Sequence, residues 1–339
     1  MCIKTNSALR LKDVLQALTY LGVILALRLP GQWVWDSWFA FDGTNHHVFY
    51  LQASRALGEP IRRHRNTSVG HAISSDLKNW TVVADALAPS EPEAFDSWTT
   101  WTGSVIQDDQ GLWRMFYTGT SREDQGERQS VGVATSTDLM TWTKLGSESI
   151  AAADSRWYKT LSGGFTNEPF RDPWVFKIDG ESSWTMLTTA GAKDFIDPRQ
   201  NAVMGIAKSD DLVSWTVHPP LGGPDQGFGE TEVFQYAEVD GVPLLLFCCG
   251  PIWLSDERKA RGEIGGVYSL PVNRDLSNVD FNRAVLYEDT DVYASRLVQS
   301  ADGTWNLIAF VNEVDGKFVG ELSDPIPVTA DPVLGLIKR

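Results

Sequence analysis

A strand-like apolar run that recurs five times is the feature that most constrains how this 339-residue chain can fold. The runs lie at 47–51, 113–117, 184–188, 244–247 and 307–310, and the steps between their marker residues Tyr50, Tyr117, Leu187, Phe247 and Phe310 are 67, 70, 60 and 63 residues. A short turn ending in glycine precedes each run, beginning with Asp42-Gly43. Such a turn between apolar segments predicts a β-hairpin, so each repeat starts with two antiparallel strands.

A second string follows in the first three repeats, at 70–80, 132–142 and 205–215, with the pattern Gly-x-x-x-Ser-x-Asp-Leu-x-x-Trp. A strand, a Ser/Asp turn and a Trp that starts the next strand explain this pattern without a ligand. We therefore expect Trp80, Trp142 and Trp215 to pack between strands rather than to bind a substrate. The fourth repeat keeps only the strand-like segment 265–270.

Five repeats, each with room for about four short strands, predict an all-β fold. The expected architecture is a five-bladed β-propeller with four-stranded antiparallel blades around a central channel. No amphipathic helical pattern separates the strands, which excludes two α/β domains. The propeller should span residues 29–339 as a single domain, without a C-terminal β-sandwich. Either 23–29 or 317–328 should supply the outer strand of the last blade, because ring closure removes an exposed sheet edge.

Residues 1–28 are expected to form an N-terminal extension. Its apolar run at 14–27 contains polar residues and lacks a small-x-small cleavage site before Pro30, which argues against a signal peptide. We expect a helix over 11–20, a strand near 23–29 and a cytoplasmic location, with secretion as the alternative.

The chain carries 44 acidic against 29 basic residues, a formal net charge of -15. This charge argues against nucleic acid and against an anionic membrane surface as partners. A neutral small-molecule or oligosaccharide substrate fits better, and the 14 Trp residues offer aromatic faces for a sugar as well as for core packing. Three Cys give no disulfide framework, and no spacing of His, Cys or carboxylates predicts a metal site or another cofactor.

Acidic residues recur at one phase of the repeat. Asp36, which lies among three Trp, precedes its marker by 14 residues, and the equivalent positions are Ser104, Asp172, Glu232 and Tyr293, at 13, 15, 15 and 17 residues. Because the first strand of each propeller blade lines the channel, these residues should meet near its mouth. Cleavage of a glycosidic bond needs one carboxyl that keeps its proton and one that is ionised. Asp36, Asp172 and Glu232 are therefore the candidate catalytic residues, and the alternative is that each caps a strand turn.

Further residues are candidate substrate contacts. They are Trp35, Gln52, Trp101, Ser104, Arg171 and Tyr293. Trp101 and Ser104 share a string that could equally be an ordinary strand entering a sheet. Arg171 either orients Asp172 or contacts a hydroxyl, with a plain ion pair as the alternative. Glu230 competes with Glu232 for one role, because alternation places both on the same strand face.

These strings resemble the five-bladed propeller glycoside hydrolases of families 32 and 68, which process fructosyl groups, with family 43 as a more distant relative. Trp35-Asp36-Ser37-Trp38 is similar to the nucleophile string of the levansucrases, and Arg171-Asp172-Pro173 is similar to the Arg-Asp-Pro motif of both fructosyl families. Trp101-Thr102-Gly103-Ser104 resembles another levansucrase string, with Ser104 at the sugar-contacting position. Asp291-Val292-Tyr293-Ala294 resembles an Asp-Phe-Tyr-Ala string of family 32. The order of Glu232, Asp240-Gly241 and the strand at 244–247 resembles that around the family 32 acid/base residue.

The resemblance implies a β-fructofuranosidase-like glycosidase that acts on sucrose or short fructans by a retaining double displacement. Asp36 would be the nucleophile, Glu232 the acid/base and Asp172 the group that holds sugar hydroxyls, with the Asp36 and Glu232 carboxyls about 5 Å apart. Two features depart from family 32: Val-Phe follows Glu232, and the Asn-Asp-Pro-Asn string is absent. Fructosyl transfer, an inverting α-L-arabinofuranosidase of the family 43 type and a non-catalytic sugar-binding propeller remain open.

Overall fold

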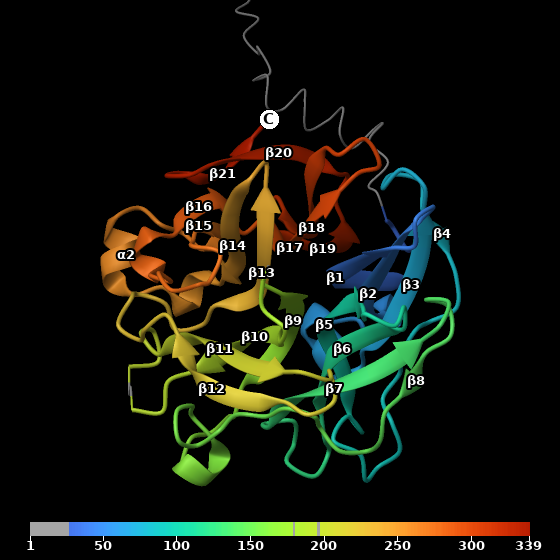
Figure 1. Ribbon diagram of the computed structural model, residues 1–339, viewed down its shortest axis with the longest axis horizontal. Coiled ribbons are helices and arrows are strands. Elements are labelled where there is room, and N and C mark those ends of the chain that lie inside the picture. Colours follow the sequence, from blue (N-terminus) through green and yellow to red (C-terminus); the bar gives the residue numbers. More distant parts are fainter. Residues whose placement is uncertain (1–26, 179, 195–196) are drawn as a thin grey trace, which may run out of the picture.

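Five antiparallel sheets surround one axis in the computed structural model, which describes residues 27–178, 180–194 and 197–339 (Figure 1). Blade 1 contains β1 (Gln32–Phe41), β2 (His46–Ser54), β3 (Ser68–Ser74) and β4 (Thr81–Val82). Blade 2 contains β5 (Thr99–Gln107), β6 (Trp113–Thr120), β7 (Gln129–Ser136) and β8 (Thr143–Lys144). Blade 3 contains β9 (Phe170–Lys177), β10 (Trp184–Gly191), β11 (Ala202–Ser209) and β12 (Thr216–Leu221). The predicted five-bladed all-β architecture is confirmed.

The last two blades follow the same order. Blade 4 contains β13 (Glu232–Val239), β14 (Val242–Cys249), β15 (Gly266–Pro271) and β16 (Val285–Glu288). Blade 5 contains β17 (Val292–Gln299), β18 (Trp305–Val314), β19 (Lys317–Leu322), β20 (Ile326–Asp331) and β21 (Gly335–Lys338). Short helices are η1 (Arg55–Leu57), η2 (Pro60–Arg65), η3 (Leu161–Gly163), η4 (Pro251–Trp253), α2 (Asp256–Ala260) and η5 (Phe281–Arg283). The five recurrent runs of the sequence are the second strands, and the first strands β1, β5, β9, β13 and β17 contact one another around the axis.

All five inner strands of the described chain break register with their neighbour at the same level. The breaks enclose Asp36, Thr102, Asp172, Val233 and Ala294. Four of these residues have positive φ angles, from 20° at Asp36 to 59° at Val233, in a region that L-residues rarely adopt. A β-bulge of this kind adds a residue and changes the direction of a side chain. The repeat therefore builds one special backbone position per blade at the same end of the channel.

The Ser-x-Asp-Leu-x-x-Trp strings have the structural role that was predicted. In the first string, Asp76 Oδ1 accepts hydrogen bonds from the amides of Lys78 and Asn79, and the buried Leu77 has a φ of 62°. Two of the Trp residues pack edge-on against the preceding blade: Trp142 lies 5.5 Å from Phe49, and Trp215 lies 5.6 Å from Phe116. These contacts fill the spaces between blades 1, 2 and 3.

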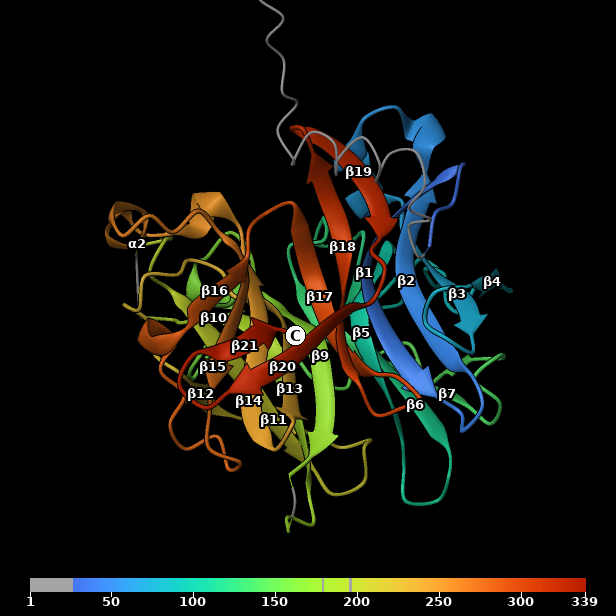
Figure 2. The ribbon, with the colours of Figure 1, turned by 90° about the horizontal axis from the view of Figure 1, so that it is seen from above.

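The C-terminal tail closes blade 5. β18 pairs with β19 along one part of its length and with β20 along another, and β20 pairs with β21 (Figure 2). β21 reaches blade 4, where the amide of Leu336 donates to Ser269 Oγ over 2.9 Å. Of the alternative closing segment, Leu27 makes an isolated bridge to Leu322, and 23–26 lie outside the described residues. The tail at 317–328 therefore supplies the closing strands.

The contact between the first and last blades is partly ionic. Arg55 Nη2 donates to the carbonyl oxygen of Val319 over 2.9 Å and lies 3.6 Å from Oε1 of the buried Glu321. Arg28, which precedes β1, pairs with the same oxygen over 2.9 Å. The helix expected over 11–20 lies outside the described residues. Within the described part of the chain, no helix has the length and apolar character needed to cross a bilayer.

Candidate active site

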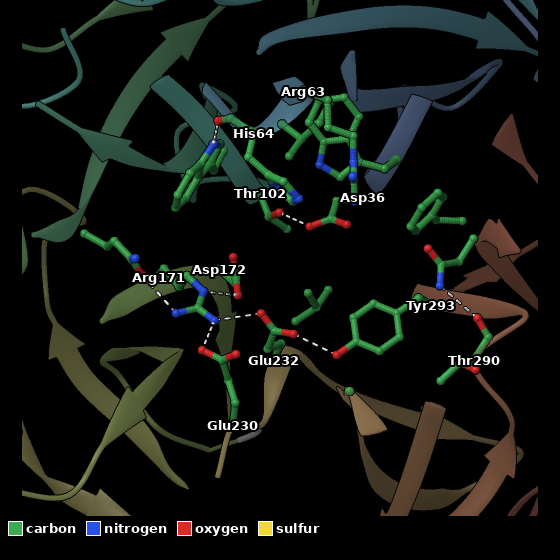
Figure 3. A pocket seen from close by; sticks show the side chains of 18 of the residues that line it. Asp36, Arg63, His64, Thr102, Arg171, Asp172, Glu230, Glu232, Thr290 and Tyr293 are labelled. Carbon is green, nitrogen blue, oxygen red and sulfur yellow. Dashed lines mark hydrogen bonds and ion pairs between the residues drawn. The ribbon is translucent and has the colours of Figure 1, made fainter. Parts of the chain in front are cut away.

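A pocket of about 510 Å³ lies where the bulged segments of the inner strands meet (Figure 3). Its lining includes Asp36, Asp172 and Glu232, the three carboxylates predicted from the repeat phase. It also includes the predicted contacts Trp35, Trp101, Arg171 and Tyr293. Residues from β1, β5, β9, β13 and β17 thus converge on one cavity, as the propeller geometry required.

Asp36 sits in the bulge of β1 and accepts a hydrogen bond from the hydroxyl of Thr102 in the bulge of β5. Burial raises the pKa of Asp36; the Thr102 hydrogen bond lowers it, and the charge of Glu232 raises it further. Arg63 and Arg296 act as cations that lower it. Asp36 is therefore a partly buried carboxylate whose ionised form is stabilised by one hydrogen bond, from Thr102, and by the charges of two arginines.

Arg296 is fully buried beneath this site. Its Nη1 donates to the carbonyl oxygens of Val233 and Phe234 over 2.7 and 3.0 Å. Burial lowers the pKa of Arg296 to about 10, and the negative charges of Asp172 and Asp36 oppose that shift. The guanidinium remains charged at neutral pH and supplies positive charge behind the two aspartates.

Asp172 is buried in the bulge of β9. Its Oδ2 accepts from Thr189 Oγ1 over 2.9 Å, and its amide donates to Thr118 Oγ1 over 2.8 Å. Burial raises the pKa of Asp172 to about 7, against the lowering effect of Arg171. The backbone and the side chain are therefore both fixed before any ligand arrives.

Arg171 connects the acidic residues. Its Nη2 lies 2.5 Å from Glu230 Oε1 and 2.7 Å from Glu232 Oε1, and its Nε lies 3.4 Å from Asp172 Oδ2. Nη1 donates to Gln129 Oε1 over 2.9 Å. Burial lowers the pKa of Arg171, but the neighbouring carboxylates outweigh that effect and raise it well above its usual value. Arg171 therefore stays charged and fixes the relative positions of three carboxylates.

Glu232 lies between Arg171 and Tyr293. The Tyr293 hydroxyl donates to Glu232 Oε2 over 2.7 Å. Burial, and then the charge of Glu232, raises the pKa of Tyr293 well above its ordinary value, so the phenol stays neutral and keeps its proton for this bond. Both oxygens of Glu232 thus accept hydrogen bonds.

The wall between blades 1 and 2 is aromatic. Trp101 Nε1 donates to the carbonyl oxygen of His64 over 2.8 Å, and the His64 ring lies 6.1 Å from Trp35. Burial lowers the pKa of His64 to about 3, with Arg63 and other arginines adding to the shift. The imidazole is therefore neutral at neutral pH, and the Arg63 guanidinium lies 5.3 Å from the centre of the Trp35 ring. A neutral polar group and flat rings are suited to binding a sugar.

The structure places two of the predicted contacts outside this pocket. Gln52 lies on the second strand of its blade, where its Nε2 donates to Ser68 Oγ over 3.3 Å, and it is absent from the pocket lining. Ser104 is buried between blades, where its Oγ accepts from the amide of Val175 over 3.1 Å. The count back from the marker selected Ser104, but the bulge of β5 lies two residues earlier, at Thr102. Thr102 is the residue of blade 2 that reaches Asp36.

Several pocket residues were missed at the sequence level. They are Arg63, His64, Thr102, Gln129, Asn167, Thr290, Asn312 and Glu313. One signal was available: the basic run Arg62-Arg63-His64-Arg65 is unusual in so acidic a chain and forms most of η2, at the pocket edge. Apart from Thr102, which lies in the bulge of β5, the other missed residues lie on connections or near strand ends, where the repeat gives no phase.

The fold and the pocket together define a class: a five-bladed β-propeller with a cluster of carboxylates where its inner strands meet. A family model described as "Glycosyl hydrolases family 32 N-terminal domain" matches residues 37–320. The chain belongs to glycosyl hydrolase family 32. The resemblance inferred from the sequence strings is confirmed at the level of the family.

The chain is also similar to individual proteins. It is 30% identical over 193 residues to a sucrose-6-phosphate hydrolase of Bacillus subtilis, a match that covers 57% of this chain and 34% of that protein. Two solved structures share the fold at 20% identity. They are an inulosucrase from Halalkalicoccus jeotgali bound to kestose (TM-score 0.70; 91% of this chain, 88% of that one) and a sucrose-6-phosphate hydrolase from Lactobacillus gasseri (TM-score 0.71; 93% and 62%). The chain thus spans about a third of the length of the B. subtilis relative.

Proposed function

We propose that the protein is a retaining, exo-acting glycosidase that cleaves β-fructofuranosides such as sucrose or a short fructan. The observation that carries this proposal is the convergence of Asp36, Asp172 and Glu232, from three inner strands, in one pocket with aromatic walls. The names of the relatives, which include sucrose-6-phosphate hydrolase and an inulosucrase bound to kestose, support the same substrate class.

In the first step Asp36 attacks the anomeric carbon while Glu232 gives a proton to the leaving oxygen. The bond from Asp36 forms as the glycosidic bond breaks, which leaves a fructosyl ester on Asp36 and a neutral alcohol. In the second step Glu232 takes a proton from water, whose oxygen attacks the same carbon and restores the Asp36 carboxylate. Two inversions give net retention.

Asp172 and Arg171 hold the sugar rather than react with it. The bulge and the hydrogen bonds to Thr118 and Thr189 fix Asp172, so its carboxyl can bind ring hydroxyls without reorganising. Positive charge develops on the sugar ring in the transition state, and buried carboxylates placed beforehand stabilise that charge. Trp35 and Trp101 supply the apolar walls of the subsite.

A substrate screen tests the proposal. The purified chain is incubated with sucrose, inulin, levan and aryl arabinofuranosides, and the products are identified, with the Asp36→Asn and Glu232→Gln variants alongside. We expect fructose from at least one fructoside and its loss in both variants. Proton NMR of the first-formed anomer should give β-fructofuranose. The inverted anomer would make Asp36 the base for water, and release of sugar that is the same in both variants would exclude these residues from catalysis.

A further inference from the structure

Two glutamates at the entry to β13 share one nitrogen of Arg171. Nη2 lies 2.5 Å from Oε1 of Glu230 and 2.7 Å from Oε1 of Glu232. The intervening Thr231 is fully buried, as expected when side chains alternate in an extended segment. Figure 3 shows both carboxylates joined to the same end of the guanidinium. The charges of these three side chains are therefore coupled.

The contact with Arg171 creates a chemical conflict. In the proposed reaction Glu232 has to carry a proton when it meets the leaving group, yet an arginine in direct contact favours the ionised form of a carboxyl. A second carboxylate on the same nitrogen removes the conflict, because its negative charge offsets the arginine and disfavours a second ionisation nearby. Burial raises the pKa of Glu230, with Arg171 acting in the opposite direction.

We propose that Glu230 is a positioning residue for the catalytic proton: together with Arg171 it keeps one proton on the pair formed by Glu230 and Glu232. This inference rests on the proposed function. Oε1 of each glutamate accepts from the same nitrogen of Arg171, and Tyr293 donates to the other oxygen of Glu232. When Glu232 exchanges Arg171 for the leaving oxygen, the shared proton lies on Glu232 and Glu230 carries the negative charge. The proton then goes to the leaving alcohol, and the water of the second step returns one to the pair.

Other titratable groups also face the pair. They are Asp172 on β9, Asp36 on β1, Tyr293 on β17, Cys248 and Cys249 on β14, and Lys159 on the connection before β9. Burial raises the pKa of Cys248 to about 12, so that thiol is neutral in the working range. Burial lowers the pKa of Lys159, while Glu230 opposes that shift. Lys159 and Arg171 are the cations of this set, and both lower the pKa of Glu230 against the effect of burial.

The test is the pH dependence of kcat/KM for the wild type, Glu230→Gln, Glu230→Asp and Glu238→Gln. Glutamine keeps the shape and the acceptor for Arg171 but removes the charge. Glu238 lies on the same strand and pairs with Arg274 at the surface over 2.7 Å, so its variant is the matched control. Each protein is assayed with sucrose, which needs a protonated leaving group, and with an aryl fructofuranoside whose leaving group does not.

In Glu230→Gln the arginine faces one carboxyl instead of two, so the shared proton should be released at lower pH. The basic limb of the sucrose profile should therefore move down by about one pH unit. The aryl substrate should lose less rate, and Glu230→Asp and Glu238→Gln should keep the wild-type limb. Lys159→Met removes a cation that faces Glu230, so it should move the basic limb to higher pH. This variant tests the inference independently if Glu230→Gln does not fold.

A basic limb that stays in place in both Glu230→Gln and Lys159→Met would overturn the inference. In that case a raised KM in Glu230→Gln would mark Glu230 as a plain sugar contact. A wild-type protein that releases no sugar contradicts the proposed function itself, so the two failures are distinguishable.

Discussion

The hydroxyl of Thr102 donates a hydrogen bond to Oδ2 of Asp36, joining the bulges of two neighbouring blades. Both side chains point to the pocket because each inner strand gains a residue at that level. The proposed nucleophile is thus oriented by the adjacent blade rather than by its own strand.

Replacing Thr102 with Val should move the acid limb of kcat/KM to higher pH. The hydrogen bond lowers the pKa of Asp36, so its loss raises that pKa. At a given acidic pH a larger fraction of Asp36 is then protonated and cannot attack the sugar. The expected shift is about one pH unit or less. Thr102→Ser keeps the hydroxyl and should keep the wild-type limb. If Val and Ser behave alike, the hydrogen bond does not set the ionisation of Asp36.

The backbone beside the bulge of β5 should tolerate no added side chain. A Cβ on Gly103 would lie 2.0 Å from the carbonyl oxygen of Phe116, whereas a Cβ on Gly31 would meet nothing within 4 Å. Gly103→Ala should therefore lower the free energy of unfolding by at least about 2 kcal/mol. Gly31→Ala should stay within about 0.5 kcal/mol. Chemical denaturation measures both, and equal values for the two variants would contradict the packing described for this bulge.

The buried His71 should make the protein less stable in acid. His47 Nδ1 lies 2.9 Å from His71 Nε2, and burial lowers the pKa of His71 to about 3. Between pH 6.5 and about 3 the unfolded chain binds a proton that the folded chain does not, so stability falls as the pH falls through this window. The contribution of His71 is about 1.4 kcal/mol per pH unit.

The variant His71→Phe isolates that contribution. Phe replaces a ring that stacks on Phe49 with centroids 4.4 Å apart, and it cannot titrate. The free energy of unfolding should therefore depend less steeply on pH in the variant, whatever its stability at neutral pH. Parallel slopes in the two proteins would mean that His71 is protonated alike in both states.

The fold could be predicted from the sequence because the pattern that defines a blade occurs five times. Five apolar runs with a glycine turn before each can be counted, and the second strands lie at those runs. Asp36 and Asp172 could be found because an acid stands at the same phase in both repeats. Ser104 lies outside the pocket for a local reason: Thr102, two residues earlier, occupies the bulge of β5, and the periodicity of the sequence does not show which residue a bulge turns toward the channel.

The supporting groups of the pocket were harder to predict. Arg296 lies beyond the break in β17, and nothing in its local string shows that it is buried behind Asp36 and Asp172. His64 reaches the pocket from a short helix between strands, a connection that carries no repeat phase. Such residues depend on how distant segments meet in space, which a count along the chain does not give.

The central claim is that Asp36 forms a covalent bond to the sugar, and trapping that bond tests it most directly. In Glu232→Gln, an aryl fructofuranoside with a good leaving group should react with Asp36, while the second step stalls for lack of a base. Mass spectrometry of the quenched protein should then show one added fructosyl unit on the peptide that contains Asp36. An adduct on another residue, or turnover of the aryl substrate with no adduct at any time, would contradict the account.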